Sequence, residues 1–309
     1  MAPSATEVEH INELTHQLTP IEHNLDENVA FGGDDQWYYH VPSKRFDLSR
    51  GARRKIVIDA DDGIRNHRGV MIDPAKSVLV IIDMQNYFIH PKYRDHAGGI
   101  AAIEPLLKVI KRCREEGIQL AWVNWGITDY DLKVMPAAVT RGFNRSLVAD
   151  KGHGWHIGLG APLPDGEGRC LFKGTWNADI YEPLKEIMTP EDVCFDKARM
   201  SGLWSPELEM HKWLRDSGKK TLLFAGVNTD QCLLGTLTDA YNWGWDCILM
   251  NDCAATMTSA EAQAVCDYNI ASVIMPPSRI LQLTLSSTNM GFVTDSKAFL
   301  EADIITTGK

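Results

Sequence analysis

After Pro74, short aliphatic and β-branched runs alternate with stretches of helical pattern through most of the chain. The runs occupy residues 78–82, 120–123, 193–195, 222–225, 248–250 and 271–275. Uninterrupted apolar strands indicate burial on both faces of a sheet, and the helices between them supply the crossovers that parallel strands need. The alternation therefore predicts an α/β fold with a mostly parallel, six-stranded sheet covered by helices on both sides.

Two of the intervening stretches carry helix start and stop signals. Residues 100–116 place apolar side chains at helical spacing and stop at Gly117, a residue suited to the left-handed position after a helix. Ser205 and Pro206 supply an N-cap and a preset first turn, and Gly218 ends the apolar stripe that follows them. Both helices lead directly into an apolar run, as helix-to-strand units do.

The chain divides into three parts around this pattern. Residues 1–74 are polar, and we interpret them as an N-terminal extension that wraps a core or a neighbouring subunit, not as an independent domain. Residues 75–278 form the sheet domain, in which the long insert at 125–191 is placed to act as a substrate lid, and residues 279–309 form a C-terminal tail. Because about 200 residues already complete a domain, we expect the extension and the tail to bury apolar surface in a homo-dimer or tetramer. The alternative is that both fold back on their own subunit.

Charge and composition exclude several classes of protein. The chain has 31 Lys and Arg against 41 Asp and Glu, a net charge of −10, which leaves no basic field for nucleic acid or an anionic membrane. No apolar run reaches the 18 or so residues of a bilayer span, and the acidic N-terminus differs from a secretory signal, so we expect a cytoplasmic protein. The seven cysteines include no Cys-x-x-Cys pair, which argues against a disulfide framework and a standard zinc cage.

The sequence lacks the common phosphate and serine-nucleophile motifs. No G-x-G-x-x-G follows a predicted strand, and neither G-x-x-x-x-G-K-[ST] nor G-x-S-x-G occurs. Dinucleotide binding, phosphate-loop chemistry and a serine nucleophile elbow therefore lose support.

Three reactive side chains follow predicted strands, at the edge where parallel sheets place functional groups. Asp83 ends the first strand, Lys197 ends the third, and Cys232 lies shortly after the fourth, at a helix start. Alone, Asp83 is as often a capping or turn residue, and Lys197 and Cys232 are more often a solvated and a packing residue. Together they form a consistent nucleophile site, because an ammonium and a helix N-terminus favour a thiolate and a carboxylate can take its proton.

Three segments carry a family resemblance. IIDMQNYF at 81–88, DKARMSGLWSPEL at 196–208 and GVNTDQC at 226–232 resemble, in this order, the signature segments of the isochorismatase-like cysteine hydrolase superfamily. The resemblance implies a doubly wound, three-layer α/β sandwich and a catalytic triad of Cys232, Asp83 and Lys197. It also implies a cis peptide at Val227–Asn228, with the Asn228 and Cys232 amides forming an oxyanion hole.

The residues after the second strand separate the branches of this superfamily. The nicotinamidase branch has metal-binding histidines there, whereas Asn124 and Trp125 are more similar to the ureidoacrylate and N-carbamoyl amidohydrolase branch. With Gln85 and Tyr87, these two residues are the predicted substrate-binding set. His153 and His156 have no neighbouring third ligand, so we predict no metal and no cofactor.

The resemblance implies a cysteine-dependent amidohydrolase that cleaves a C–N bond of a small carboxamide or N-carbamoyl (ureido) substrate through a covalent acyl-enzyme. One alternative is an isochorismatase-type hydrolase, which cleaves a vinyl ether and needs no cysteine nucleophile. Another is a non-catalytic binding protein that keeps the fold, against which the complete triad argues.

Overall fold

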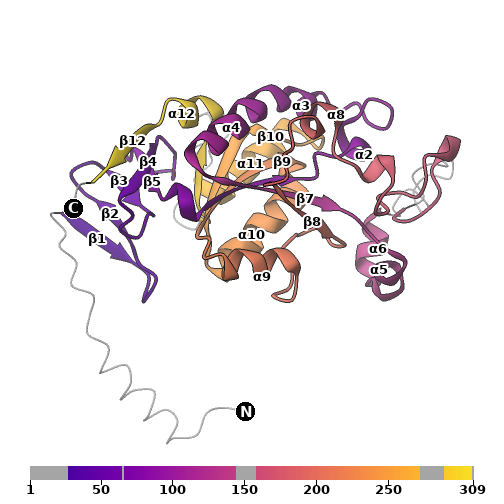
Figure 1. The fold of residues 1–309 in the computed structure, drawn as a ribbon, viewed down its shortest axis with the longest axis horizontal. Coiled ribbons are helices and arrows are strands. Elements are labelled where there is room, and N and C mark those ends of the chain that lie inside the picture. Colours follow the sequence, from indigo (N-terminus) through magenta and orange to yellow (C-terminus); the bar gives the residue numbers. More distant parts are fainter. Residues whose placement is uncertain (1–26, 65, 144–157, 272–288, 308–309) are drawn as a thin grey trace, which may run out of the picture.

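The computed structural model describes residues 27–64, 66–143, 158–271 and 289–307, which form two six-stranded sheets (Figure 1). The strands of the larger sheet run in the order β11-β10-β9-β6-β7-β8, and every neighbouring pair is parallel. They are β6 (Ser77–Ile82), β7 (Gln119–Trp125), β8 (Val193–Lys197), β9 (Thr221–Val227), β10 (Asp246–Ala255) and β11 (Phe292–Thr294). This confirms the predicted parallel sheet.

Helices cover both faces of this sheet because its strands are apolar on both sides. In β6, Leu79 and Ile81 belong to one core cluster, whereas Val78, Val80 and Ile82 belong to the other. The first cluster is covered by α4 (Ile103–Glu116), α8 (Glu182–Lys185) and α12 (Ser296–Leu300). The second is covered by α9 (Glu209–Asp216), α10 (Leu234–Trp243) and α11 (Ala260–Ala271). Figure 1 shows α4 and α12 above the sheet and α9 and α10 below it, which confirms the three-layer sandwich.

The sixth strand differs from the expectation. Residue 271 is the last residue of α11, and residues 272–275 lie outside the described residues. The edge position is taken instead by β11, from the segment interpreted as a tail, which pairs with β10 through Ile248, Leu249 and Met250. Three residues in a polar context give too short an apolar run to be recognised as a strand.

Two helix boundaries also differ from the sequence pattern. The stretch expected to run from residue 100 is divided into α3 (Ala97–Ala101) and α4, which ends as predicted at a left-handed Gly117. The helix expected after Ser205 begins later, with α9, because the Ser205 hydroxyl accepts the Glu207 N–H in a separate turn.

The second sheet is built mainly from the N-terminal extension and lies at one end of the molecule (Figure 1). Its order is β1-β2-β3-β5-β4-β12, and only the β3–β5 pair is parallel. The strands are β1 (Asn28–Phe31), β2 (Trp37–His40), β3 (Arg45–Asp47), β4 (Arg54–Ile58), β5 (Gly69–Ile72) and β12 (Asp303–Thr306). Ile56, Ile58 and Ile72 are fully buried in the same core cluster as α4, so the extension packs on its own chain.

Short helices occupy the connections of the chain, and all of those described here except η1, which leads into β6, follow the carboxyl ends of parallel strands. They are η1 (Pro74–Lys76), α2 (Asn86–Ile89), α5 (Asp129–Val134), α6 (Ala137–Phe143), η2 (Pro164–Gly166), η3 (Trp176–Ala178) and the π-helical turn η4 (Thr229–Leu233). The predicted insert thus contributes four of these short helices to the part of the chain that is described.

Candidate active site

The carboxyl ends of β6 and β9 meet where the strand order reverses. β6 is the first strand of this sheet along the chain and lies between β7 and β9. β7 and β8 follow on one side of it, and β9, β10 and β11 are then added on the other side. The loops after two such strands diverge and leave a crevice, where open α/β sheets bind their ligands. Asp83 directly follows β6, and Asn228 leads from β9 into η4, which contains Cys232.

Asp83 and Lys197 form a buried ion pair at this edge of the sheet. Lys197 Nζ lies 3.0 Å from Asp83 Oδ2, and the side chains are 2% and 1% exposed. The ammonium also donates to the carbonyl of Arg199 at 3.3 Å and lies 4.1 Å from the centroid of the Trp125 ring. A buried charge is costly unless it is paired, and these three neighbours supply the compensation.

The backbone at Asp83 bends sharply as β6 ends. Asp83 has a φ of 51°, a left-handed conformation that is uncommon for residues other than glycine. Its N–H donates to the Val123 carbonyl at 3.0 Å, and its own carbonyl accepts the Gln85 N–H at 2.7 Å. Hydrogen bonds on both sides of the bend therefore hold the carboxylate in place, and such backbone conformations concentrate at functional sites.

Cys232 lies beside this ion pair and keeps its proton in the resting site. Burial raises the pKa of the thiol to about 12; the Lys197 charge and the Trp125 indole oppose this rise, and Asp83 adds to it. Burial also raises the pKa of Asp83, against the lowering effect of Lys197 and Cys232. Lys197 acts on the thiol in the direction that the sequence predicts, but burial has the larger effect because the thiol is withdrawn from water.

Gln85 holds the end of β7. Its Oε1 accepts the backbone N–H of Trp125 at 2.9 Å, and its Nε2 donates to the carbonyls of Trp125 (2.7 Å) and Ala178 (2.5 Å). The amide of this fully buried side chain is thus engaged within the chain. The contact between Gln85 and the substrate stays a prediction.

Tyr87 and Asn124 occupy different surroundings. The Tyr87 hydroxyl accepts a hydrogen bond from Arg94 at 3.3 Å, the Arg94 guanidinium lies 5.1 Å from the ring centroid, and burial raises the pKa of the phenol. Asn124 is 9% exposed, and its Oδ1 has no hydrogen-bond partner in the described part of the chain. An acceptor without a partner is rare in a protein interior, so this oxygen is available to a bound molecule.

The peptide bond between Val227 and Asn228 is cis, as the resemblance implies. The side chain of Asn228 is held by a residue that the sequence analysis missed: His96 Nε2 lies 3.0 Å from Asn228 Oδ1. The two residues are 132 positions apart, and no motif or spacing connects them. Only the fold brings His96 to the site.

Comparison with known proteins identifies the family. The isochorismatase domain model matches residues 77–272, from β6 beyond the end of α11. The chain belongs to the isochorismatase family. The matched residues include β6, β9 and the η4 turn, which carry Asp83, Asn228 and Cys232 at or directly after their ends.

Relatives of this isochorismatase-family chain include amidohydrolases. The RutB ureidoacrylate amidohydrolase of Methylorubrum extorquens is 30% identical over 198 residues, which cover 59% of this chain and 71% of the relative. The RutB ureidoacrylate amidohydrolase of Agrobacterium fabrum is 24% identical over 214 residues, which cover 65% of this chain and 85% of the relative. These similarities confirm the resemblance to the superfamily and its ureidoacrylate branch.

A solved structure shares the fold of this isochorismatase-family chain. A cysteine hydrolase of Pseudomonas syringae pv. phaseolicola superposes with a TM-score of 0.55 at 17% identity, over 74% of this chain and 92% of that chain. This similarity supports the architecture described above.

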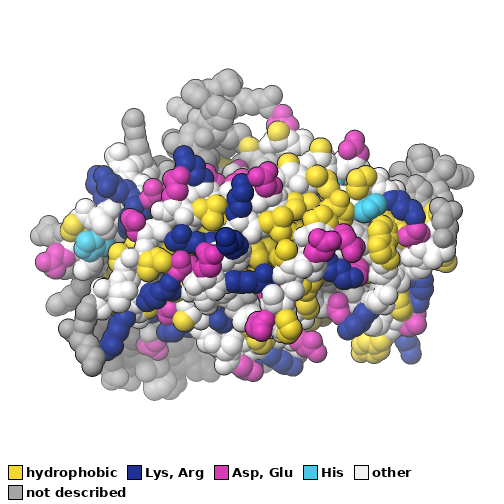
Figure 2. Space-filling view, turned by 45° about the horizontal axis from the view of Figure 1, so that its top comes forward, with side chains coloured by type: hydrophobic (Ala, Val, Ile, Leu, Met, Phe, Trp, Pro, Cys, Tyr) yellow, Lys and Arg dark blue, Asp and Glu magenta, His cyan; other side chains and the backbone are white. Residues whose placement is uncertain are grey.

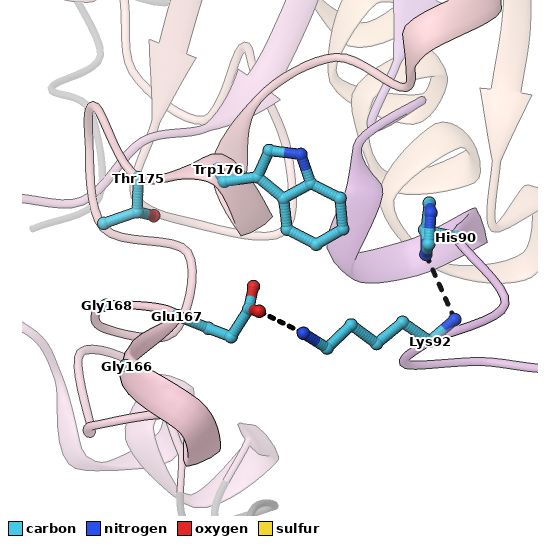
Figure 3. A pocket seen from close by; sticks show the side chains of 7 residues that line it. All are labelled: His90, Lys92, Gly166, Glu167, Gly168, Thr175 and Trp176. Atoms are coloured by element: carbon cyan, nitrogen blue, oxygen red, sulfur yellow. Dashed lines mark hydrogen bonds and ion pairs between the residues drawn. The ribbon is translucent and has the colours of Figure 1, made fainter.

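A second cleft of this family member lies between the insert and the residues after α2 (Figure 3). It is lined by His90, Lys92, Gly166, Glu167, Gly168, Thr175 and Trp176. Lys92 is paired with Glu167, and its Nζ lies 5.9 Å from the Trp176 ring centroid. The lining residues include none of the predicted catalytic ones, and the ion pair satisfies both charges, so we assign no role to this cleft.

The described surface is mixed in charge. Figure 2 shows basic and acidic side chains interspersed over the face in view, among apolar side chains. Within the described ranges, no set of three or more His, Cys, Asp or Glu side chains is arranged to hold a metal ion, and no helix is long and apolar enough to cross a bilayer. His153 and His156 lie outside those ranges.

Proposed function

We propose that the chain is a cysteine-dependent amidohydrolase that cleaves a C–N bond of a small carboxamide or N-carbamoyl (ureido) substrate. The observation that carries this proposal is the Asp83–Lys197 ion pair beside Cys232, buried at the switch point of the sheet. A nucleophile, a base and a fixed positive charge within one crevice are the requirements of acyl transfer through a covalent intermediate. The names of the RutB relatives support the same bond class.

The first step forms the acyl-enzyme. The Asp83 carboxylate takes the proton of the Cys232 thiol as the sulfur attacks the carbonyl carbon, and the carbonyl π electrons move to oxygen. Because burial raises the pKa of Asp83, its carboxylate is a stronger base than an exposed one, which suits it to a thiol that keeps its proton at rest. The oxyanion faces the backbone amides of Asn228 and Cys232, and each such donor contributes about 3–4 kcal/mol in comparable enzymes.

The second step releases the products. The tetrahedral intermediate collapses with cleavage of the C–N bond, and the leaving nitrogen takes the proton from Asp83. Water then attacks the thioester or thiocarbamate, giving its proton to Asp83 and breaking the C–S bond, and the sulfur recovers that proton. The ammonium of Lys197 stabilises the anionic forms of Asp83 and of Cys232 in turn.

Asn124 and Trp125 complete the proposed pocket. The unpartnered Asn124 Oδ1 is a hydrogen-bond acceptor for a substrate N–H, such as the terminal amide of a ureido group. The Trp125 ring contacts Phe143 of α6 at 4.9 Å between centroids, so an aromatic wall stands beside the ion pair. A hydrogen-bond acceptor and an apolar wall are both features of sites that bind small, planar amides.

The test uses Cys232→Ala and Cys232→Ser in a screen of small amides and ureido acids for ammonia release. We expect both variants to lose at least about a thousandfold in turnover, because the covalent route is removed. Cys194→Ser is the matched control, since Cys194 is exposed, and it should keep full activity.

Mass spectrometry of the wild-type protein after rapid quenching should show the acyl group on the peptide that contains Cys232. Retained amide hydrolysis in Cys232→Ala would refute the nucleophile assignment. Cleavage of a vinyl ether by that variant would favour the isochorismatase-type alternative.

A further inference from the structure

The hydrogen bonds of His96 define the protonation of its two ring nitrogens. His96 is 2% exposed and caps the first turn of α3, where its Nδ1 accepts the Gly99 N–H at 2.9 Å. A nitrogen that accepts cannot carry the proton of a neutral imidazole, so the proton is on Nε2. Nε2–H therefore donates to Asn228 Oδ1 at 3.0 Å.

Asn228 is held from two separate segments. Its Oδ1 also accepts the backbone N–H of Met257 at 3.0 Å, from the loop after β10. Its backbone carbonyl accepts the N–H groups of Gln231 (3.1 Å) and Leu233 (3.3 Å) in η4. The side chain and the backbone of Asn228 are thus both held by hydrogen bonds. Directly after the carboxyl end of β9, the residue links the start of α3, the loop after β10 and η4.

The glycines that follow His96 permit this contact. A Cβ on Gly99 would lie 2.8 Å from Ile89 Cγ2 and 3.1 Å from the His96 ring, and one on Gly98 would lie 3.2 Å from Ala255 Cβ. Side chains at these positions would push α3 away from the imidazole and from β10. The two glycines of the His-Ala-Gly-Gly segment therefore allow the buried His96 imidazole to lie against Asn228. Capping a helix alone does not require this contact.

We propose that His96 is a positioning residue for the oxyanion hole and acts through Asn228. The inference rests on the proposed function, in which the Asn228 backbone amide faces the oxyanion. The Nε2–H···Oδ1 bond fixes the side chain of the residue whose amide must be placed to within about 0.5 Å. Loss of that bond should slow the steps that develop an oxyanion and leave other reactions of Cys232 unchanged.

Two substitutions separate the two hydrogen bonds of the ring. His96→Gln places an amide N–H near the position of Nε2 and keeps the donor to Asn228, whereas His96→Asn places a carbonyl near Nδ1 and keeps only the acceptor for Gly99. Each variant loses one buried hydrogen bond, so we expect similar decreases in Tm. Only His96→Asn should impair the oxyanion hole.

Two reagents that modify Cys232 can measure the difference between the His96 variants without the natural substrate. Acylation by p-nitrophenyl acetate passes through a tetrahedral oxyanion, whereas alkylation by iodoacetamide does not. We expect His96→Asn to slow acylation of Cys232 by about tenfold or more, with the alkylation rate within twofold of wild type. His96→Gln should acylate within about threefold of wild type, and Asn228→Ala should slow acylation with no further loss when His96→Asn is added.

Equal acylation rates in the two His96 variants, or parallel losses of acylation and alkylation, would overturn the positioning role. A wild-type protein that is not acylated at Cys232 would instead refute the proposed nucleophile, and the inference would fall with it. The two failures are therefore distinguishable in one experiment.

Discussion

At the scale of single residues, the site depends on which buried group has a charged partner. Cys113, Cys247 and Cys253 are also buried, but among the described cysteines only Cys232 lies beside the ion pair of Asp83 and Lys197. Asp83, Lys197 and Cys232 could be predicted because each follows a strand at a known edge of a parallel sheet. His96 could not, since its role depends on a contact with Asn228 that no local pattern encodes.

Removal of the Lys197 charge should raise the pKa of the Cys232 thiol. The Lys197 charge is the largest single effect that lowers this pKa against the burial of the thiol, and Lys197→Met removes it. We expect iodoacetamide to modify Cys232 about tenfold or more slowly near pH 8, in proportion to the smaller thiolate fraction. Peptide mass spectrometry checks this across a pH series, with the exposed Cys194 as internal reference. An unchanged rate at Cys232, or an equal decrease at Cys194, would remove the electrostatic role of Lys197.

At the scale of elements, burial patterns that repeat along a strand or helix were predictable, and isolated short segments were not. The left-handed Gly117 ends α4 where the sequence indicates, because glycine tolerates that backbone conformation. β11 was missed because it has only three residues and is recognisable only by its pairing with β10. α9 carries a further buried group that its apolar stripe does not reveal, His211.

His211 should make the protein less stable in mild acid. Its ring lies 5.0 Å from the rings of Trp243 and Trp245, and neither nitrogen has a hydrogen-bond partner in the described part of the chain. Burial, with Arg215, lowers its pKa in the folded state. The pKa of His211 in the unfolded chain is about 6.5. As the pH falls below this value, the unfolded chain binds a proton at His211 that the folded chain does not bind, so the free energy of unfolding decreases.

The check is urea unfolding of His211→Phe and wild type between about pH 5 and pH 8. The variant should lose less stability than the wild type on the acid side. The same acid slope in His211→Phe and wild type would show that other groups cause the loss.

At the scale of the whole molecule, an ion pair ties the second sheet to the amino ends of the parallel strands. Arg50 donates to both carboxylate oxygens of Asp246, at 2.5 and 3.0 Å, and its Nε donates to Asp35 at 2.6 Å. Asp246 begins β10 and also accepts the Thr221 hydroxyl at the start of β9. Apolar tail residues such as Phe292 and Phe299 are buried within the same chain, so they do not require a partner; the oligomer stays a prediction.

Arg50→Met should destabilise the protein by about 3–5 kcal/mol, because it leaves the buried Asp246 carboxylate without its main partner. Arg50→Met with Asp246→Asn should recover part of that loss. Lys108→Met, which breaks a pair with the 80% exposed Glu104, should change the stability little, because both charges are solvated. Chemical denaturation compares the three variants. A loss for Arg50→Met no larger than for Lys108→Met would contradict the stabilising role of the Arg50–Asp246 pair. The folded fraction of each variant should retain its activity, since this pair lies at the opposite edge of the sheet from Cys232.

Both sheets acquire their last strand from the same short segment. β11 pairs with β10, whereas β12 pairs with β4, so that Asp303 lies opposite Val57. During translation, one edge of each sheet stays unpaired until residues 292–306 have left the ribosome, and the closure of so large a loop is slow. A nascent chain of this protein therefore carries two open strand edges from the synthesis of β10 until β11 has been made. Premature termination before β11 exposes both at once, and open edges are where polypeptides aggregate.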